Sequence, residues 1–278
     1  MKITAIKVKT RYWPPGTDHV QEVVEAVKEV LQDGDIVSIS EKAISTAMGN
    51  LIDESQVKPG RLAKLLTSFW MRRLWGGPLG NLAKLKEHTK ERLKNYPNNE
   101  GAAHKQVALE HVGLLQALRH YSEGGIDASN LPYSYVCLPL EDPKRIADSI
   151  HIELEAIGKY LSTIIVDGDT TYSKRNLHIA PRKVPIPGII HIGGFLTFLL
   201  GRKLDFTARS TPLAESGAIR NPDFLLTLAN VSHRVRGHGA GRTVWDMARS
   251  FGVGLTDVTW EMLRHVDHYP IAILRIEE

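Results

Sequence analysis

The chain alternates between segments with the periodicity of strands and segments with the periodicity of helices, and this alternation limits the folds open to it. Residues 3–12 (ITAIKVKTRY) alternate apolar and polar side chains, which predicts a half-buried strand ending before Pro14–Gly16. An apolar stripe from Val20 to Leu31 then predicts a helix, capped by Thr17 or Asp18 and ended by Gly34. The chain therefore opens with a strand and a helix, and Ile36–Ile39 predicts the next strand.

The same alternation continues along the chain. After a turn or helix at Ser40–Ser45, residues 62–118 are mostly helical in pattern, with breaks that we expect to be mobile loops at Trp75–Asn81 and Tyr96–Gly101. The remaining predictions are a strand at Tyr135–Leu138, a helix from Asp142 with Pro143 in its first position, a strand at Ile164–Val166 that ends in a functional turn, a helix at Val244–Arg249 and a strand at Pro270–Ile276.

Interleaved elements of this kind predict an α/β or α+β fold rather than a bundle or a sandwich. The sequence shows no internal repeat and no low-complexity segment. We expect one domain over residues 1–278, and if it has two lobes, their boundary falls near residues 120–160.

Composition narrows the class of protein. With 278 residues, 42% of them hydrophobic, the chain can bury a substantial core. Its longest apolar stretches, such as Ile189–Leu200, are interrupted and fall short of the roughly 20 residues that span a bilayer. The N-terminus lacks the features of a secretory signal, so we expect a cytoplasmic protein with no membrane contact.

Cys137 is the single cysteine. One thiol excludes an internal disulfide framework, a zinc finger and an iron–sulfur cluster. Cys137 lies in the apolar run YVCLPL, so we expect it to be a small buried side chain without chemistry.

The charge balance points to small anionic partners. The chain has 35 Lys and Arg against 31 Asp and Glu, which gives a net charge of +4 and a pI near 9.0. Basic and acidic residues alternate in Leu82–Pro97, which indicates a solvated helix. A mildly basic chain of this kind suits anionic small molecules better than nucleic acid, for which we predict no role.

Two segments carry carboxylates beside glycines: Glu123–Asn130 (EGGIDASN) and Val166–Tyr172 (VDGDTTY). Mg²⁺ or Mn²⁺ is typically held by one or two carboxylates together with water and substrate phosphate oxygens. Asp127 with Asp167 or Asp169 would suffice if the segments converge, and Thr170 could add a hydroxyl. The alternative is that Asp and Gly occur here only because turns favour them.

Five segments in order carry a resemblance to a known family: DGDIVSISEKAIS (Asp33–Ser45), EGGIDASNLP (Glu123–Pro132), CLPLEDP (Cys137–Pro143), TIIVDGDT (Thr163–Thr170) and HYPIAILRI (His268–Ile276). In order and approximate spacing they resemble the coenzyme F420-0:L-glutamate (gamma-glutamyl) ligase family. The resemblance implies a mixed α/β fold of the gamma-glutamyl ligase type and an enzyme that joins L-glutamate to a carboxylate of a phosphorylated deazaflavin precursor. It also implies GTP as co-substrate, Mg²⁺ or Mn²⁺, an acyl phosphate intermediate and a homodimer.

Carried over by position, the resemblance assigns roles to individual residues. Asp127, Asp167, Asp169 and Thr170 match metal-binding positions, with the choice between Asp167 and Asp169 open. Lys42 matches an early lysine that contacts phosphate, although an ordinary surface lysine is the alternative. The expected contacts to the nucleotide or substrate comprise Lys42, Ser129, Asn130, Lys174 and Arg175, the last two matched only loosely.

The sequence also departs from the family pattern. Thr46, Met48 and Asn50 stand where the family has charged residues, so a relative that binds a phosphorylated molecule without turnover is the alternative function. The glycine-rich and basic stretch Ser232–Thr243 suits a flexible loop closing on phosphates, or equally a loop without function. We expect His265 and His268 to be ordinary residues beside a strand rather than metal ligands.

Overall fold

A mixed sheet organises the computed structural model, which describes residues 2–158 and 161–277. The described residues form a seven-stranded sheet in the order β1-β9-β2-β5-β6-β7, with β8 paired to β5. The strands are β1 (Lys2–Thr10), β2 (Ile36–Ser40), β5 (Ser162–Lys174), β6 (Leu177–Ala180), β7 (Ile189–His191), β8 (Thr207–Ser216) and β9 (His268–Glu277). Strand β2 runs parallel to β5 and antiparallel to β9, so the expected α/β class is confirmed.

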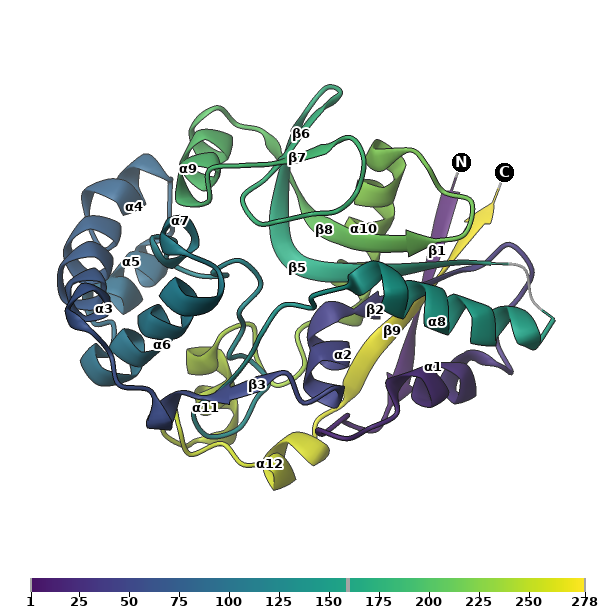
Figure 1. Ribbon diagram of the computed structural model, residues 1–278, viewed down its shortest axis with the longest axis horizontal. Coiled ribbons are helices and arrows are strands. Elements are labelled where there is room, and N and C mark those ends of the chain that lie inside the picture. The colour runs from purple at the N-terminus through teal and green to yellow at the C-terminus, as the bar shows by residue number, and fades with distance from the viewer. Residues whose placement is uncertain (1, 159–160, 278) are drawn as a thin grey trace.

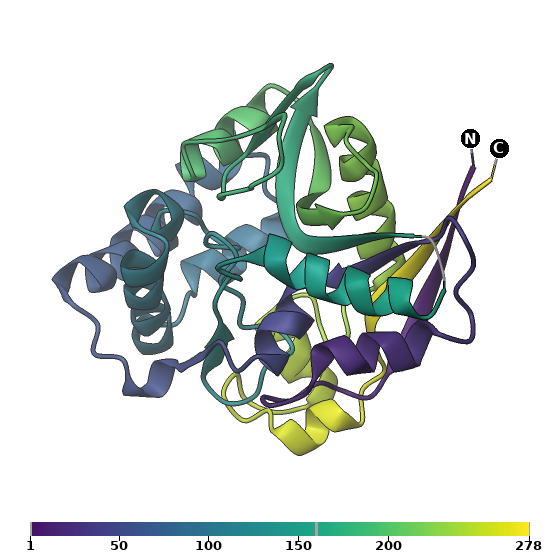
Figure 2. The same ribbon diagram turned by 45° about the vertical axis from the view of Figure 1, so that its right-hand side comes forward.

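Helices cover both faces of this sheet. Helices α1 (His19–Val27) and α8 (Pro143–Ala156) contact each other on one face, and α10 (Pro222–Arg236) packs against the opposite face (Figures 1 and 2). Buried aliphatic side chains from all three helices and from the strands between them form one core. Because β1 and β9 are paired, the two ends of the described chain lie side by side (Figure 1).

Local capping signals placed two of these helices correctly. The Asp18 carboxylate accepts hydrogen bonds from the backbone of Val20 and Gln21, each at 3.1 Å, at the start of α1. Asp142 likewise caps α8, which has Pro143 as its first residue. Helix α1 ends earlier than predicted, at Val27, because the chain turns back there to enter β2, and this turn leaves Val30 exposed.

A second, helical region inserts between two short strands, β3 (Leu51–Asp53) and β4 (Tyr135–Cys137), which pair with each other. It contains a 3-10 helix (Glu54–Gln56), α3 (Arg61–Leu65), a π-helix (Leu66–Trp75), α4 (Pro78–Leu82), α5 (Glu87–Lys94), α6 (Asn98–His111) and α7 (Leu114–Ala117). These helices gather at the side of the sheet opposite to the chain termini (Figure 1). The helical prediction for residues 62–118 is confirmed. The loop predicted at Trp75–Asn81 is wrong over most of its length, because only Gly76 and Gly77 form a turn between the π-helix and α4.

The mobile loop predicted at Tyr96–Gly101 is wrong. Residues 98–101 form the first turn of α6, and the Tyr96 ring packs on Gly101 in the interior. Polar residues at a helix start were mistaken for a loop, because Asn and Gly are common in both settings.

The functional turn predicted after Ile164–Val166 is also not a turn. Strand β5 continues through Asp167–Thr170 to Lys174, alongside β8, with irregular register between Asp167 and Thr170. An irregularity of this kind inserts residues that lack a direct partner and redirects side chains, so the acidic residues lie on a bulged strand.

The remaining helices are α2 (Glu41–Ala47), α9 (Phe195–Lys203), α11 (Val244–Phe251) and α12 (Trp260–Arg264). Helix α2 follows β2 directly, and α11 lies between α10 and the final strand in the chain. Among the described residues, no helix combines the length and the apolar character needed to cross a bilayer.

Gly101 gives a test of the packing around α6. A Cβ added there would lie 2.7 Å from Tyr96 Cδ1 and 3.1 Å from Thr67 Cγ2. Gly101→Ala should lower the free energy of unfolding by about 1–3 kcal/mol through overpacking, although Ala normally stabilises a helix relative to Gly. Urea denaturation measures the change. The exposed Asn99→Ala in the same helix turn should change stability by less than about 0.5 kcal/mol. A Gly101→Ala protein as stable as the wild type contradicts this packing.

Candidate functional site

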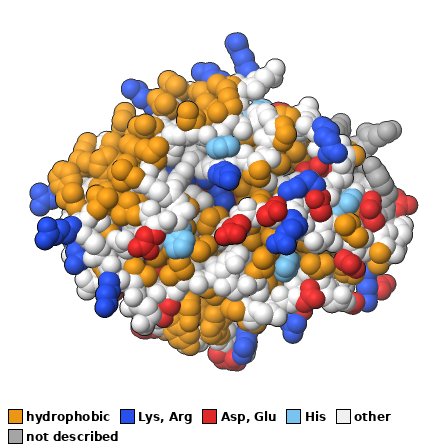
Figure 3. Space-filling model, in the orientation of Figure 1, with side chains coloured by type: hydrophobic (Ala, Val, Ile, Leu, Met, Phe, Trp, Pro, Cys, Tyr) orange, Lys and Arg blue, Asp and Glu red, His pale blue; other side chains and the backbone are white. Residues whose placement is uncertain are grey.

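A cavity of about 530 Å³ lies between the helical region, the end of β2, the middle of β5, and the residues at and after the end of α10. In the view of Figure 3 the surface is hollowed near its centre, with Lys, Arg and His side chains around the hollow. Seven of the residues predicted from the sequence line this cavity: Lys42, Asp127, Ser129, Asn130, Asp167, Asp169 and Thr170. Segments separated by more than a hundred positions in the sequence therefore meet at one site.

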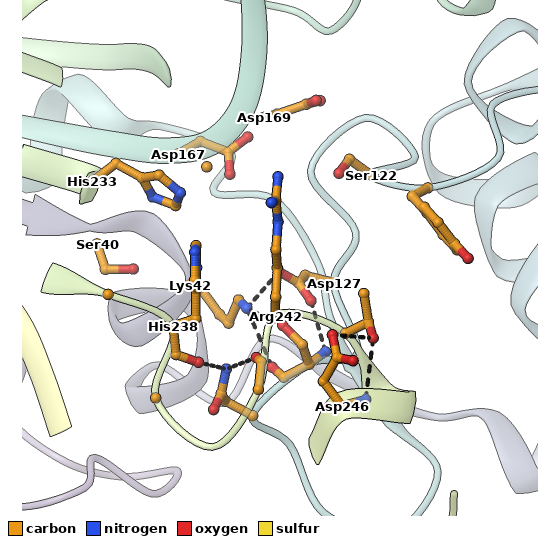
Figure 4. A pocket seen from close by; sticks show the side chains of 18 of the residues that line it. Ser40, Lys42, Ser122, Asp127, Asp167, Asp169, His233, His238, Arg242 and Asp246 are labelled. Carbon is orange, nitrogen blue, oxygen red and sulfur yellow. Dashed lines mark hydrogen bonds and ion pairs between the residues drawn. The ribbon is translucent and has the colours of Figure 1, made fainter. Parts of the chain in front are cut away.

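Lys42 and Asp127 form the first cluster in this cavity. Lys42 is in the first turn of α2, and its Nζ lies 2.5 Å from Asp127 Oδ2 and donates to Ser129 Oγ at 2.6 Å (Figure 4). The other Asp127 oxygen accepts from the Ser129 backbone at 2.7 Å. The backbone of Asp127 pairs with that of Cys137, which anchors the segment to β4. Lys42 is therefore engaged in the cavity rather than a free surface lysine.

Asn130 holds a neighbouring loop in place. Its backbone has a φ of 57°, a conformation that Asn tolerates better than most residues. The side-chain Nδ2 donates to the carbonyls of His238 and Gly241, each at 3.1 Å, and Oδ1 accepts from Ala240 N at 2.7 Å. The amide is thus used in fixing residues 238–241 against the cavity.

The stretch Ser232–Thr243, predicted as one flexible loop, has two parts. Residues 232–236 complete α10, and the following residues form a loop fixed by Asn130. His233, Arg236, His238 and Arg242 line the cavity, whereas Arg234 is exposed and does not. This stretch therefore supplies part of the site.

The two aspartates left as alternatives have different environments. Asp169 accepts two hydrogen bonds from Arg119, both at 2.7 Å, and the two side chains are each only 3% exposed. Asp167 pairs with Arg182, and 18% of its side chain is exposed. The bidentate pair occupies the Asp169 carboxylate, so Asp167 is the better placed of the two to meet a ligand.

Arg182 joins Asp167 to a second carboxylate. Its Nη1 and Nη2 donate to Glu41 at 2.6 and 3.0 Å, and Nη1 also donates to Asp167. Burial raises the pKa of Asp167, but the Arg182 guanidinium outweighs this effect and holds that pKa below its ordinary value. Burial dominates at Glu41 and raises its pKa despite the same guanidinium. Of the two carboxylates, Asp167 therefore has the pKa below its ordinary value and Glu41 the pKa above it.

The cavity suits an anionic ligand and, with it, a hard cation. Among the described residues, no group of three or more His, Cys, Asp or Glu side chains forms a metal cage. Asp127 and Asp167 nevertheless both present oxygens to this cavity, and Ser129 and Thr170 add hydroxyls. Such a set fits Mg²⁺ or Mn²⁺ held partly by substrate phosphates. The lining cations are Lys42, Lys86, Arg92, Arg119, Arg202, Arg236 and Arg242.

Lys174 and Arg175, predicted to contact the ligand, are not among the residues that line this cavity. Lys174 is the last residue of β5, with its Nζ 5.4 Å from the centroid of the Phe206 ring, and Arg175 is in the turn to β6 with a φ of 54°. The structure thus separates them from the other predicted residues.

Other expectations and omissions are clear from the geometry. Cys137 is 1% exposed, and burial raises the pKa of its thiol, which confirms the expected small buried residue. His268 starts β9, and its Nδ1 lies 2.8 Å from the Arg11 carbonyl.

Sequence reasoning missed Glu41 and Arg119. Arg119 belongs to none of the five segments, whereas Glu41 lies in the segment Asp33–Ser45, directly before Lys42, and this position could have indicated it.

A second cavity of about 620 Å³ adjoins the first and shares Asp127, Ser129 and Arg242 with it. Aromatic side chains from α11, the helical region and the residues before β4 line this second cavity: Tyr96, Tyr121, Tyr133, Tyr135 and Trp245. Its wall also contains a buried charge cluster in which His104 lies 2.7 Å from Glu54 and 3.4 Å from Glu123. Lys105 Nζ lies 2.5 Å from Glu123 in the same cluster.

Comparison with known proteins identifies relatives. Residues 7–209 match the model of the F420-0:gamma-glutamyl ligase family. An uncharacterized protein of Methanocaldococcus jannaschii is 36% identical to this chain, over 99% of the chain and 97% of the relative. The family match covers Lys42, Asp127 and Asp167, whereas the cationic residues after α10 lie beyond it.

The His104 cluster predicts a pH dependence of stability. Burial lowers the pKa of His104, but Glu54 and Glu123 outweigh it and raise the pKa to about 10, against about 6.5 for an unfolded histidine. Between these values only the folded chain holds the proton, so the free energy of unfolding falls as pH rises. Urea denaturation from pH 6 to 10 should show a shallower fall in His104→Gln than in the wild type.

The exposed His88→Gln serves as the control and should keep the wild-type slope. Equal slopes in wild type and His104→Gln would mean that His104 does not hold an additional proton in the folded protein.

Proposed function

The chain belongs to the F420-0:gamma-glutamyl ligase family, and we propose that it forms an amide between L-glutamate and a carboxylate of a phosphorylated deazaflavin precursor, with GTP and Mg²⁺ or Mn²⁺. The family match shows that the chain is a member of a ligase family. The nucleotide, the cation and the acceptor are our proposal, supported by the cavity described above.

Amide formation from a free carboxylate needs activation, because an oxide ion is too poor a leaving group. In the proposed reaction a carboxylate oxygen of the acceptor attacks the γ-phosphorus of GTP, and GDP leaves. The amine of glutamate then attacks the acyl carbon of the resulting acyl phosphate, inorganic phosphate leaves, and the amine loses a proton. Such a sequence depends mainly on positioning and charge stabilisation.

The residues of the cavity fit these demands. Asp127 and Asp167 would hold the divalent cation, which when bound supplies positive charge to the phosphates. Lys42 lines the cavity, held by Asp127 and Ser129, where its ammonium can meet a phosphate oxygen. Arg242 lines both cavities and lies where the two join.

The observation that carries the proposal is the convergence of Asp127 and Asp167 on one cation-rich cavity. Aromatic rings in the adjoining cavity supply apolar surface beside it, which suits a substrate with both a charged group and a planar ring. We further propose that the protein is cytoplasmic and acts as a homodimer, a state that light scattering measures directly.

A second candidate is a relative that binds a phosphorylated molecule without turnover. Thr46, which replaces a charged residue of the family pattern, is 3% exposed and lines the cavity, so the lost charge belongs to the site. Met48, by contrast, is 43% exposed. Binding of GTP with Mn²⁺ but no phosphate release in the presence of glutamate and a deazaflavin acceptor would support this candidate.

Asp127→Asn tests the role of the carboxylate. The substitution keeps the size of the side chain and removes its charge, so Mn²⁺-dependent binding of GTP should weaken at least tenfold and phosphate release should fall with it. Calorimetry measures the binding, and a phosphate assay measures turnover.

Asp205→Asn is the matched control, because Asp205 is exposed and pairs with Lys84 away from the cavity. It should bind and turn over like the wild type. Mn²⁺-dependent GTP binding that survives in Asp127→Asn would remove Asp127 from the metal site.

A further inference from the structure

Arg236 is a buried cation for which no carboxylate of the described residues lies within ion-pair distance, although the charge of Asp167 acts on it from further away. It is the last residue of α10, is only 7% exposed and lines the cavity of about 530 Å³ described above. Its Nε lies 3.4 Å from the Ser232 carbonyl oxygen and its Nη1 lies 3.3 Å from that of Pro270. Arg119 and Arg182, which are equally buried, each hold a carboxylate.

A buried guanidinium without a counter-ion is costly. The two carbonyl oxygens and the partial negative charge at the end of α10 offset part of this cost, but both hydrogen bonds are long. Burial outweighs the attraction of the more distant Asp167 carboxylate and lowers the pKa of Arg236 to about 10, which leaves the group protonated at neutral pH. The positive charge is therefore present in the folded protein.

Trp13, a second residue that lines this cavity, has a buried donor without a partner among the residues described. Trp13 is 1% exposed, and its Nε1 has no hydrogen-bond partner in the described part of the chain. The indole nitrogen can only donate, so an acceptor is needed. Both side chains adjoin the start of β9, because Arg236 contacts Pro270 and the Trp13 ring stacks edge-on against His268 at 5.6 Å.

We propose that Arg236 and Trp13 form an oxyanion subsite at the β9 end of the cavity, which receives a carboxylate or phosphate group of a substrate. A carboxylate or phosphate would supply both the missing negative charge and the missing hydrogen-bond acceptors. Both sources occur among the substrates of the proposed ligase, as the carboxylates of glutamate and as phosphate groups. The subsite itself rests on burial and charge, so it stands even if the chain has no ligase activity.

Arg236→Met is the decisive variant. L-Glutamate and inorganic phosphate are titrated separately into wild type and variant by calorimetry, without nucleotide, and stability is measured by urea denaturation. We expect the wild type to bind at least one probe and the variant to bind that probe at least tenfold more weakly. The probe affected identifies the source of the oxyanion. Stability should stay equal or rise, because an uncompensated buried charge is removed.

Arg275→Met is the matched control. Arg275 pairs with the buried Asp35 at 2.8 Å and does not line the cavity, so its loss should lower stability and leave the affinity for both probes unchanged. Trp13→Phe keeps a ring and removes the donor, and should weaken binding of the same probe.

The proposal is overturned if neither probe binds the wild type, or if Arg236→Met binds both probes as the wild type does. If Arg236→Met weakens binding and also loses stability, Trp13→Phe decides: weaker binding of the same probe supports the subsite, and unchanged affinity overturns it. A failure of phosphate release with intact probe binding would count against the ligase reaction and not against the subsite.

Discussion

The ion-pair network centred on Arg182 is the interaction on which the geometry of the cavity depends. The parallel pairing of β2 with β5 already places Glu41, at the start of α2, beside Asp167. One guanidinium contacts both carboxylates and so ties the segment around Arg182 to these two strands. The segment 123–130 packs on the same group, since a Cβ added to Gly125 would lie 2.5 Å from Arg182 Cζ. Removing one partner of a buried pair typically costs about 3–5 kcal/mol, so this network has little freedom to rearrange.

The irregular part of β5 determines which of its two aspartates is held in a buried ion pair and which can meet a ligand. In a regular strand Asp167 and Asp169 would point to the same face. The register shifts between Asp167 and Thr170, and the two aspartates meet different arginines. Gly168 lies between them, and a Cβ there would lie 2.8 Å from His233 Cε1. Glycine therefore permits α10 to approach the strand closely, which brings the end of that helix to the cavity.

Short-range sequence signals correctly predicted the helix starts that depend only on neighbouring residues. The caps Asp18 and Asp142 marked helix starts, because a cap depends on a few neighbouring residues. The continuation of β5 beyond Val166 was not predicted, because it pairs with β8, which begins only at Thr207. No pattern of neighbouring residues indicates a pairing between segments so far apart in the sequence. The continuation of β5 also fixes the position of Lys174: a strand advances about 3.3 Å per residue, so Lys174 lies roughly 16 Å along the strand from Asp169.

The part of the candidate site that lies in sequence motifs could be predicted from the sequence. Lys42, Asp127 and Asp167 were found through such motifs, and all three line the cavity. Glu41 and Arg119 were not found, because a residue that orients another through a buried ion pair needs only the right position in space. Nor could the choice between Asp167 and Asp169 be made from the sequence, because it depends on which carboxylate Arg119 occupies.

The charges of the cavity fall into two groups with different consequences. Arg119 and Lys42 line the cavity and Arg182 lies behind Asp167; each is paired with a carboxylate, so its charge mainly holds the segments in place. A cavity lined only by such pairs would attract an anion weakly, since each cation already has its counter-ion. Affinity for an anion must come from cations that lack one, and a buried unpaired cation is most effective because water screens it least. Arg236, from a segment beyond the family match, is the described residue that meets this condition most fully.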